Sequence, residues 1–104
     1  MALITRCRRP FETALMGAAN AGNAEVMRVL LTAGANVNAA RTDGITPLML
    51  AAQSAAREAV QVLLERGANV DTKAADGMTA LLAAAADGDA GIARLLLASG
   101  ADVK

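Results

Sequence analysis

The chain has almost no aromatic side chains: Phe11 is the only one among 104 residues, and tyrosine and tryptophan are absent. A globular domain of this length normally uses several aromatic residues in its core. Alanine, with 27 residues, takes their place. This composition favours thin helices that pack at close range, and the length allows one domain at most.

Histidine is also absent, and Cys7 is the only cysteine. The chain therefore lacks the commonest general base and the commonest metal ligand. Cys7 cannot form an internal disulfide and has no histidine to activate it. Asp87 and Asp89 start like a calcium loop, but no glutamate closes it, so an inter-helix turn is the better interpretation. No glycine-rich phosphate loop occurs. We expect no catalytic residue, no cofactor and no metal ion, and hence no enzyme.

Long hydrophobic runs and a strong excess of charge are missing as well. The longest apolar run, residues 80–86, has seven residues, far fewer than the ~20 that span a bilayer. The first ten residues lack the apolar core of a secretory signal. They hold three of the ten basic residues and none of the ten acidic ones, which leaves the rest of the chain mildly acidic. We therefore expect a cytoplasmic protein that binds neither membrane nor nucleic acid.

A unit of 33 residues is present three times without a gap. It begins TALMGAANAG at Thr13, TPLMLAAQSA at Thr46 and TALLAAAADG at Thr79, and nine of its positions are identical in all three copies. A fixed period of this length marks a unit that cannot bury its apolar face alone and stacks on its neighbours. The sequence therefore predicts a small repeat array.

Each unit is predicted to form two short antiparallel helices. The threonine that opens the unit is a good N-cap, and Pro47 suits the first helical position because its missing N–H is not needed there. The first helices are predicted at 14–20, 47–54 and 80–86, and the second helices at 24–33, 57–66 and 90–99. Gly34, Gly67 and Gly100 are expected to end the second helices in the left-handed region.

The turns carry their own signals. Gly22 and Gly88 suit a positive φ angle between the two helices of a unit, whereas Ala55 holds the same position in the middle unit and would be strained there. The pairs Asp43–Gly44 and Asp76–Gly77 are typical of hairpin turns between units. We therefore predict that glycine in place of Ala55 stabilises the chain.

The units share the pattern DG-x-TPL-x-x-AA … V-x-x-LL-x-x-GA-[ND]-V-[ND], which resembles the ankyrin repeat over residues 11–104. The resemblance implies an all-α repeat solenoid of three stacked helix–turn–helix units with short β-hairpin connections. The units would span about 11–43, 44–76 and 77–104, after an N-terminal tail or partial cap at 1–10. The family's usual histidine after TPL is Met16, Met49 and Leu82 here, so its hydrogen bonds between units are absent. Asn38 takes a position that some ankyrin proteins have hydroxylated, although a hydrogen-bonding loop asparagine is the simpler interpretation.

The resemblance also implies a protein–protein interaction module, a scaffold whose partner contacts the hairpin tips and the concave face of the first helices. Carried over to this sequence, the candidate partner-binding residues are Arg41, Thr42, Asp43, Ile45, Gln53, Ser54, Lys73, Asp76, Met78 and Asp87. Arg41 belongs to the residue types that dominate binding hot spots, and Ile45 and Met78 could be apolar anchors. We expect alanine at Arg41 and Ile45 to weaken binding and leave the fold intact, and Arg57 and Arg66 to face away from the partner. Ordinary solvated hairpins remain the alternative at any single position.

A different function, a structural spacer segment of a longer ankyrin solenoid, is favoured by the last unit. Its second helix is as apolar as those of the other units, whereas an isolated array needs a polar outer face. The chain also stops at GADVK, where a further hairpin would begin. We expect Leu63 to have neighbours on both sides and Leu96 to have none beyond it. A monomer is expected, with self-association through the exposed C-terminal unit as the alternative.

Overall fold

A computed structural model describes residues 10–100 of the chain, with side chains from residue 14 onward. Within this range the chain forms six α-helices and no strand. They are α2 (Pro10–Ala21), α3 (Ala24–Thr32), α4 (Pro47–Gln53), α5 (Arg57–Glu65), α6 (Ala80–Asp87) and α7 (Ala90–Ala98). The predicted all-helical repeat solenoid is confirmed. Cys7 and the three arginines near it lie outside the described residues.

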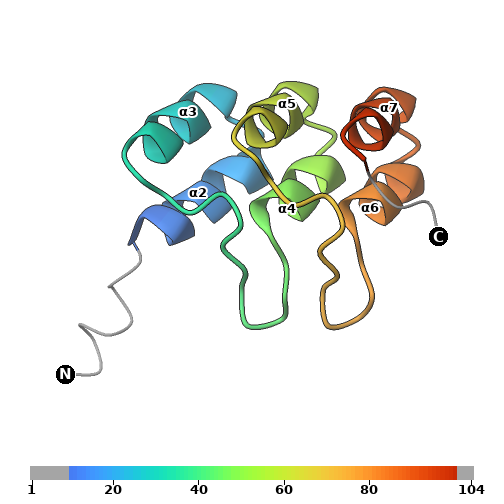
Figure 1. The fold of residues 1–104 in the computed structure, drawn as a ribbon, viewed down its shortest axis with the longest axis horizontal. Coiled ribbons are helices and arrows are strands. Elements are labelled where there is room, and N and C mark those ends of the chain that lie inside the picture. The colour runs from blue at the N-terminus through green and yellow to red at the C-terminus, as the bar shows by residue number, and fades with distance from the viewer. Residues whose placement is uncertain (1–9, 101–104) are drawn as a thin grey trace.

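The helices form two layers (Figure 1). The first helices of the units, α2, α4 and α6, make one layer, and the second helices, α3, α5 and α7, make the other. Each helix packs against its partner in the same unit and against the equivalent helix of the next unit. The first loop (residues 33–46) and the second loop (residues 66–79) project side by side from the layer of first helices. The stack of helices therefore holds both loops on the same side of the molecule.

The predicted threonine caps are confirmed in two of the three units. The Oγ1 atom of Thr46 accepts a hydrogen bond from the amide of Met49 at 3.3 Å, and that of Thr79 accepts one from Leu82 at 3.2 Å. The prediction was wrong for Thr13, because α2 begins at Pro10 and Thr13 lies inside its first turn. Proline is well suited to begin a helix, since its φ is already helical and its missing N–H would have no partner there.

The second helices have caps that the sequence analysis missed. Asn23 and Asp89 each accept a hydrogen bond through Oδ1, from the amide of Val26 at 3.2 Å and of Ile92 at 3.0 Å. Asparagine and aspartate are among the strongest N-caps, so the signal was present in the sequence. Ala56 holds the same position in the middle unit and makes no side-chain cap.

The core lies between the two layers and is built from small and aliphatic side chains. Its largest fully buried members are Leu15, Met27, Pro47, Leu48, Met49, Val60, Val62, Leu63, Ile92 and Leu96. The expectation that Leu96 lacks cover was wrong, because Leu96 is as fully buried as Leu63. The side chains left bare in the last unit are Leu82, 55% exposed, and Leu97, 45% exposed. The exposed apolar surface of this unit is therefore formed by Leu82 on α6 and Leu97 on α7, and Leu96 is not part of it.

Ala55 has the strained backbone that the sequence indicated. Its φ is 55°, and among the described residues it is the only non-glycine with a positive φ. Gly22 and Gly88 hold the equivalent positions with φ of 73° and 76°. The amides of Ala55 and Ala56 bond back to the carbonyls of Ala52 and Ala51, at 3.2 and 3.1 Å, so the end of α4 fixes this conformation.

Replacement of Ala55 by glycine is expected to raise the free energy of unfolding by up to about 1 kcal/mol, because the left-handed strain of alanine is removed while the unfolded chain gains some freedom. Gly88→Ala is the reverse control. A Cβ added at Gly88 meets no atom within 4 Å, so only backbone strain is introduced, and a loss of about 1 kcal/mol is expected. Urea unfolding of both variants measures the effect. An unchanged or lower midpoint for Ala55→Gly would contradict the prediction.

Candidate partner-binding surface

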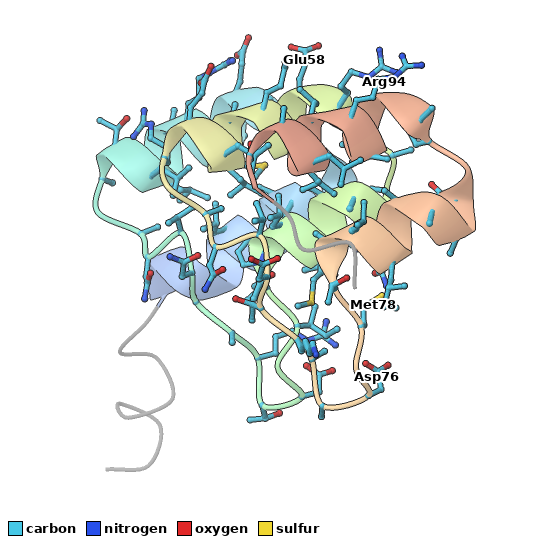
Figure 2. The ribbon with its side chains drawn as sticks, turned by 45° about the vertical axis from the view of Figure 1, so that its right-hand side comes forward. Glu58, Asp76, Met78 and Arg94 are labelled. Carbon is cyan, nitrogen blue, oxygen red and sulfur yellow. The ribbon has the colours of Figure 1, made fainter. Side chains whose placement is uncertain are left out.

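The ten candidate residues lie in two places on the stack. The first and second loops carry Arg41, Thr42, Asp43, Ile45, Lys73, Asp76 and Met78, and the C-terminal ends of α4 and α6 carry Gln53, Ser54 and Asp87. Eight of them are exposed, and Ile45 and Met78 are half-buried. Figure 2 shows Asp76 on the second loop, on the opposite side of the stack from Glu58 and Arg94 on the second helices. The loops thus present a surface that is separate from the outer face of the second helices.

The first tip, residues 41–45, is a tight turn. The amide of Gly44 donates to the carbonyl of Arg41 at 2.8 Å, and the amide of Arg41 donates to the carbonyl of Ile45 at 2.9 Å. These two bonds give the loop the shape of the predicted hairpin. They do not extend into a ladder, and no β-strand forms within residues 10–100. The tip is therefore a closed turn on an extended loop.

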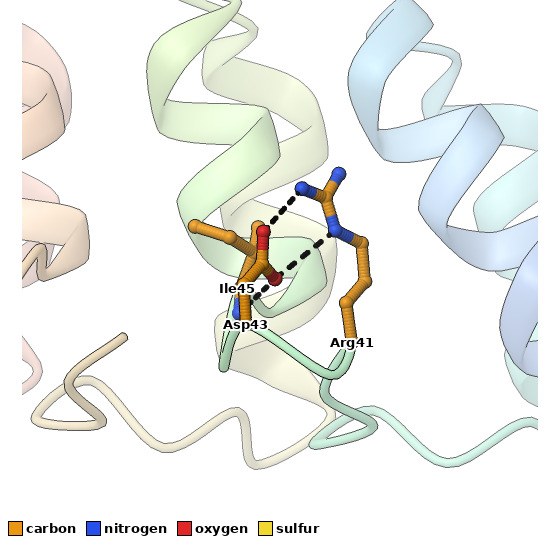
Figure 3. Close-up of polar contacts among 3 residues, drawn as sticks. All are labelled: Arg41, Asp43 and Ile45. Carbon is orange, nitrogen blue, oxygen red and sulfur yellow. Dashed lines mark hydrogen bonds and ion pairs between the residues drawn. The ribbon is translucent and has the colours of Figure 1, made fainter. Parts of the chain in front are cut away.

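Arg41 and Asp43 form a forked ion pair on the first tip (Figure 3). Nε and Nη2 of Arg41 donate to the two carboxylate oxygens of Asp43 at 3.2 and 2.7 Å, and the amide of Ile45 donates to Oδ1 at 3.2 Å. The hydrogen bonds from Arg41 have the largest effect on the pKa of Asp43 and hold it below its ordinary value, and the hydrogen bond from the Ile45 amide lowers it further. Asp43 in turn raises the pKa of Arg41. Both side chains are half exposed, so the pair contributes little to stability. It does hold the guanidinium in one orientation on the surface.

The second tip, residues 74–78, repeats this geometry with different side chains. The amide of Gly77 donates to the carbonyl of Ala74 at 2.9 Å, and the amide of Ala74 donates to the carbonyl of Met78 at 2.8 Å. Asp76 accepts from the amide of Met78 at 3.0 Å, as Asp43 does from Ile45 in the first tip. Ala74 holds the position of Arg41, so the second tip lacks the forked pair.

A backbone hydrogen bond joins the two tips. The amide of Ala75 donates to the carbonyl of Asp43 at 2.9 Å. A second link lies nearer the helices, where Oδ1 of Asn38 accepts from the amide of Asn69 at 2.7 Å. The interpretation of Asn38 as a hydrogen-bonding loop residue is thereby confirmed. The two loops are tied to each other at both levels, so their tips keep a fixed spacing.

Three candidate residues also have structural contacts. Ile45 and Met78 pack against the hydrophobic core. The hydroxyl of Ser54 donates to the carbonyl of Asn20 in the preceding unit at 2.7 Å. Alanine at Ile45 would therefore remove core contacts, so we expect a variant at Arg41 and Ile45 to lose some stability as well as binding.

Arg57 and Arg66, which were expected to face away from the partner, join neighbouring units. Arg57 lies 3.7 Å from Asp89 of the last unit, and Nη2 of Arg66 donates to the hydroxyl of Thr32 of the first unit at 3.4 Å. Their replacement would disturb stacking as well as charge. Arg28 and Arg94 are exposed on α3 and α7 and offer a cleaner control.

The part of the chain that the structure describes contains no group of three or more His, Cys, Asp or Glu side chains placed to hold a metal ion. None of the helices in residues 10–100 is long and apolar enough to cross a membrane.

The family profile for ankyrin repeats, in three copies, matches residues 15–104. No curated protein matches the chain. Ankyrin repeats are generally protein–protein interaction modules, and proteins built from them are typically not enzymes.

Proposed function

Because the chain belongs to the ankyrin repeat family, we propose that it binds a protein partner across its two loop tips. The observation that carries this proposal is the 2.9 Å hydrogen bond from the amide of Ala75 to the carbonyl of Asp43. A partner that contacts both tips meets a surface whose parts are already ordered. The conformational entropy lost on binding is therefore small, and more of the contact energy appears as affinity.

The side chains on this surface have charges of both signs. Arg41 and Asp43 lie on the first tip, Asp76 lies on the second tip and Lys73 directly precedes it, and all four are exposed. A partner of matching pattern would place an acidic group against Arg41, whose fork with Asp43 uses two of its five N–H donors. Such an arrangement favours one orientation of the partner more than it adds raw affinity.

The same partner would reach the helix ends at Gln53, Ser54 and Asp87. Helix α4 has seven residues and is therefore about 10 Å long. Gln53 is the last residue of α4, at the end of the helix that lies away from the first loop, and it is exposed. A partner in contact with the tips and with Gln53 would cover the length of the first helices, which form the face between these two places.

The experiment compares two double variants that remove the same charge. Arg41→Ala/Lys73→Ala changes the tips, and Arg28→Ala/Arg94→Ala changes the outer face of the second helices. Proteins retained from a lysate of the source organism by each immobilised variant are quantified by mass spectrometry. The tip variant should retain at least about fivefold less of a specific partner, whereas the control should match the wild type.

All four side chains are exposed, so both variants should have the urea midpoint of the wild type. Such midpoints would establish that neither variant has lost its fold. A partner that is lost from the Arg28/Arg94 variant and kept by the tip variant would place the interface on the second helices and refute the proposal.

A second function, a structural spacer in a longer repeat stack, is favoured by apolar side chains on the outer faces of the first and last units. Val29 is 67% exposed and Leu82 is 55% exposed. A spacer needs no contact at its tips, so retention of every lysate protein would be unchanged in the Arg41/Lys73 variant.

A further inference from the structure

The described part of the chain exposes four large hydrophobic side chains, and they lie in the two terminal units. Val26 and Val29 on α3 are 42% and 67% exposed, and Leu82 on α6 and Leu97 on α7 are 55% and 45% exposed. We call the first pair the N-side face and the second pair the C-side face. Among residues 14–100, whose side chains the structure describes, no other large hydrophobic residue is exposed to that degree.

The middle unit shows what covers the positions equivalent to the N-side face. The residues equivalent to Val26 and Val29 in the middle unit are Ala59 and Val62, which are 0% and 1% exposed. The difference between the two units is that α2 and α3 precede the middle unit, whereas no unit precedes α2 and α3 within residues 10–100. The N-side face is therefore the surface that a preceding unit would cover.

The same comparison identifies the C-side face. Leu82 is equivalent to Met49, which is 1% exposed, and Leu97 is equivalent to Leu64, which is half-buried. The middle unit differs from the last in having α6 and α7 packed against it. The C-side face is therefore the surface on which a following unit would stack.

We propose that the C-side face of one copy of this chain docks on the N-side face of a second copy, so that the copies stack head to tail. A second copy supplies the complementary face for each end, with apolar side chains at the positions that make this contact inside the chain. The contact uses different surfaces on its two sides, so it does not close at two copies, and chains or rings of several copies follow. This inference does not depend on the proposed function of the tips.

The joint between copies would be weaker than the joints within a chain. Inside the chain Ser54 donates to the carbonyl of Asn20 and Arg66 donates to Thr32. In the first unit the positions of Ser54 and Arg66 are held by Ala21 and Ala33, which can make neither bond. The joint therefore rests on apolar contact, so the association should depend on protein concentration and be strengthened by ammonium sulfate.

The test uses one charged substitution at each end of the full chain. Val29→Glu blocks the N-side face, and Leu82→Glu blocks the C-side face. Both side chains are more than half exposed, so the fold should survive, which circular dichroism and urea unfolding would verify. Sedimentation velocity then measures the mass of each protein up to millimolar concentration.

For the wild type, the average mass should rise with concentration and pass that of a dimer. Each variant alone should remain monomeric, because its one intact face has no complementary face to meet. An equimolar mixture of the two should form a dimer and stop there, since Val29→Glu keeps the C-side face and Leu82→Glu keeps the N-side face.

Three results would overturn the proposal. A wild type that stays monomeric at the highest concentration would mean that another protein, further repeat units or the ends of the chain itself cover these faces. A Val29→Glu variant that still dimerises alone would indicate symmetric pairing of C-side faces. A mixture in which no dimer forms would exclude the head-to-tail joint.

Discussion

Met49→Ala is expected to lower the free energy of unfolding by about 3 kcal/mol, because truncation of a large buried side chain leaves a cavity. Met49 is 1% exposed, in the layer where α4 packs against α2 and α6. Leu82 holds the same position one unit later and is 55% exposed. Leu82→Ala should therefore cost less than about 1 kcal/mol, since most of its apolar surface already faces water.

Urea unfolding at low protein concentration measures both variants. Dilution matters because self-association through the C-side face would stabilise the folded state by mass action. Similar losses from Met49→Ala and Leu82→Ala under these conditions would mean that Leu82 is covered in the isolated chain. A loss at Leu82 that grows with concentration would instead support the head-to-tail contact.

Met49 also illustrates what could be predicted from the sequence. The repeat pattern placed it where ankyrin repeats usually have histidine, and that comparison excluded imidazole hydrogen bonds between the units. The structure adds that the thioether is fully buried. Methionine suits this position because its flexible chain fills irregular space and needs no polar partner.

The regular features of the fold were predictable because each has a local cause. The helices begin and end within two residues of their predicted bounds, apart from the start of α2. Thr46 and Thr79 cap their helices, and the glycines that follow the second helices have positive φ. The start of α2 was missed because Thr13 matches the threonines of the later units in sequence, whereas Pro10 already begins the helix three residues earlier.

The distinction between Leu96 and Leu97 could not be read from the sequence. Both residues are leucines on one helix, and both recur in every unit. Whether each leucine is buried depends on which side of α7 faces α6, and this is decided by how the two helices pack. Leu96 is fully buried and Leu97 is 45% exposed.

The candidate surface was predictable as a set of exposed loop residues, but not in its internal contacts. The fork between Arg41 and Asp43 joins side chains two residues apart and depends on the turn that brings them together. The bond from Ala75 to Asp43 is made by backbone atoms of two loops. An alanine carries no side-chain signal of such a contact, so the coupling of the tips appears only in three dimensions.

Gly44→Ala should test this coupling, with an expected loss of about 2–3 kcal/mol of stability from left-handed strain and a broken hydrogen bond together. The φ of Gly44 is +83°, and a Cβ there would lie 3.0 Å from Cα of Ala74 and 3.2 Å from the amide nitrogen of Ala75. These are backbone atoms that cannot turn aside, so the second tip must move away. Gly77→Ala is the matched control, since its φ is +87° and no atom lies within 4 Å of the added Cβ. It should cost about 1 kcal/mol, from strain alone.

Hydrogen exchange of the Ala75 amide separates the two effects. Its bond to the carbonyl of Asp43 should protect it in the wild type and in Gly77→Ala, and Gly44→Ala should make it exchange faster. Equal stability losses with Ala75 still protected would show that the loops absorb the added methyl without separating. Neither substitution removes a candidate contact side chain, so both variants retain Arg41 and Lys73. If the fixed spacing of the tips is what a partner recognises, Gly44→Ala should weaken binding while Gly77→Ala leaves it unchanged, because only the first variant separates the tips.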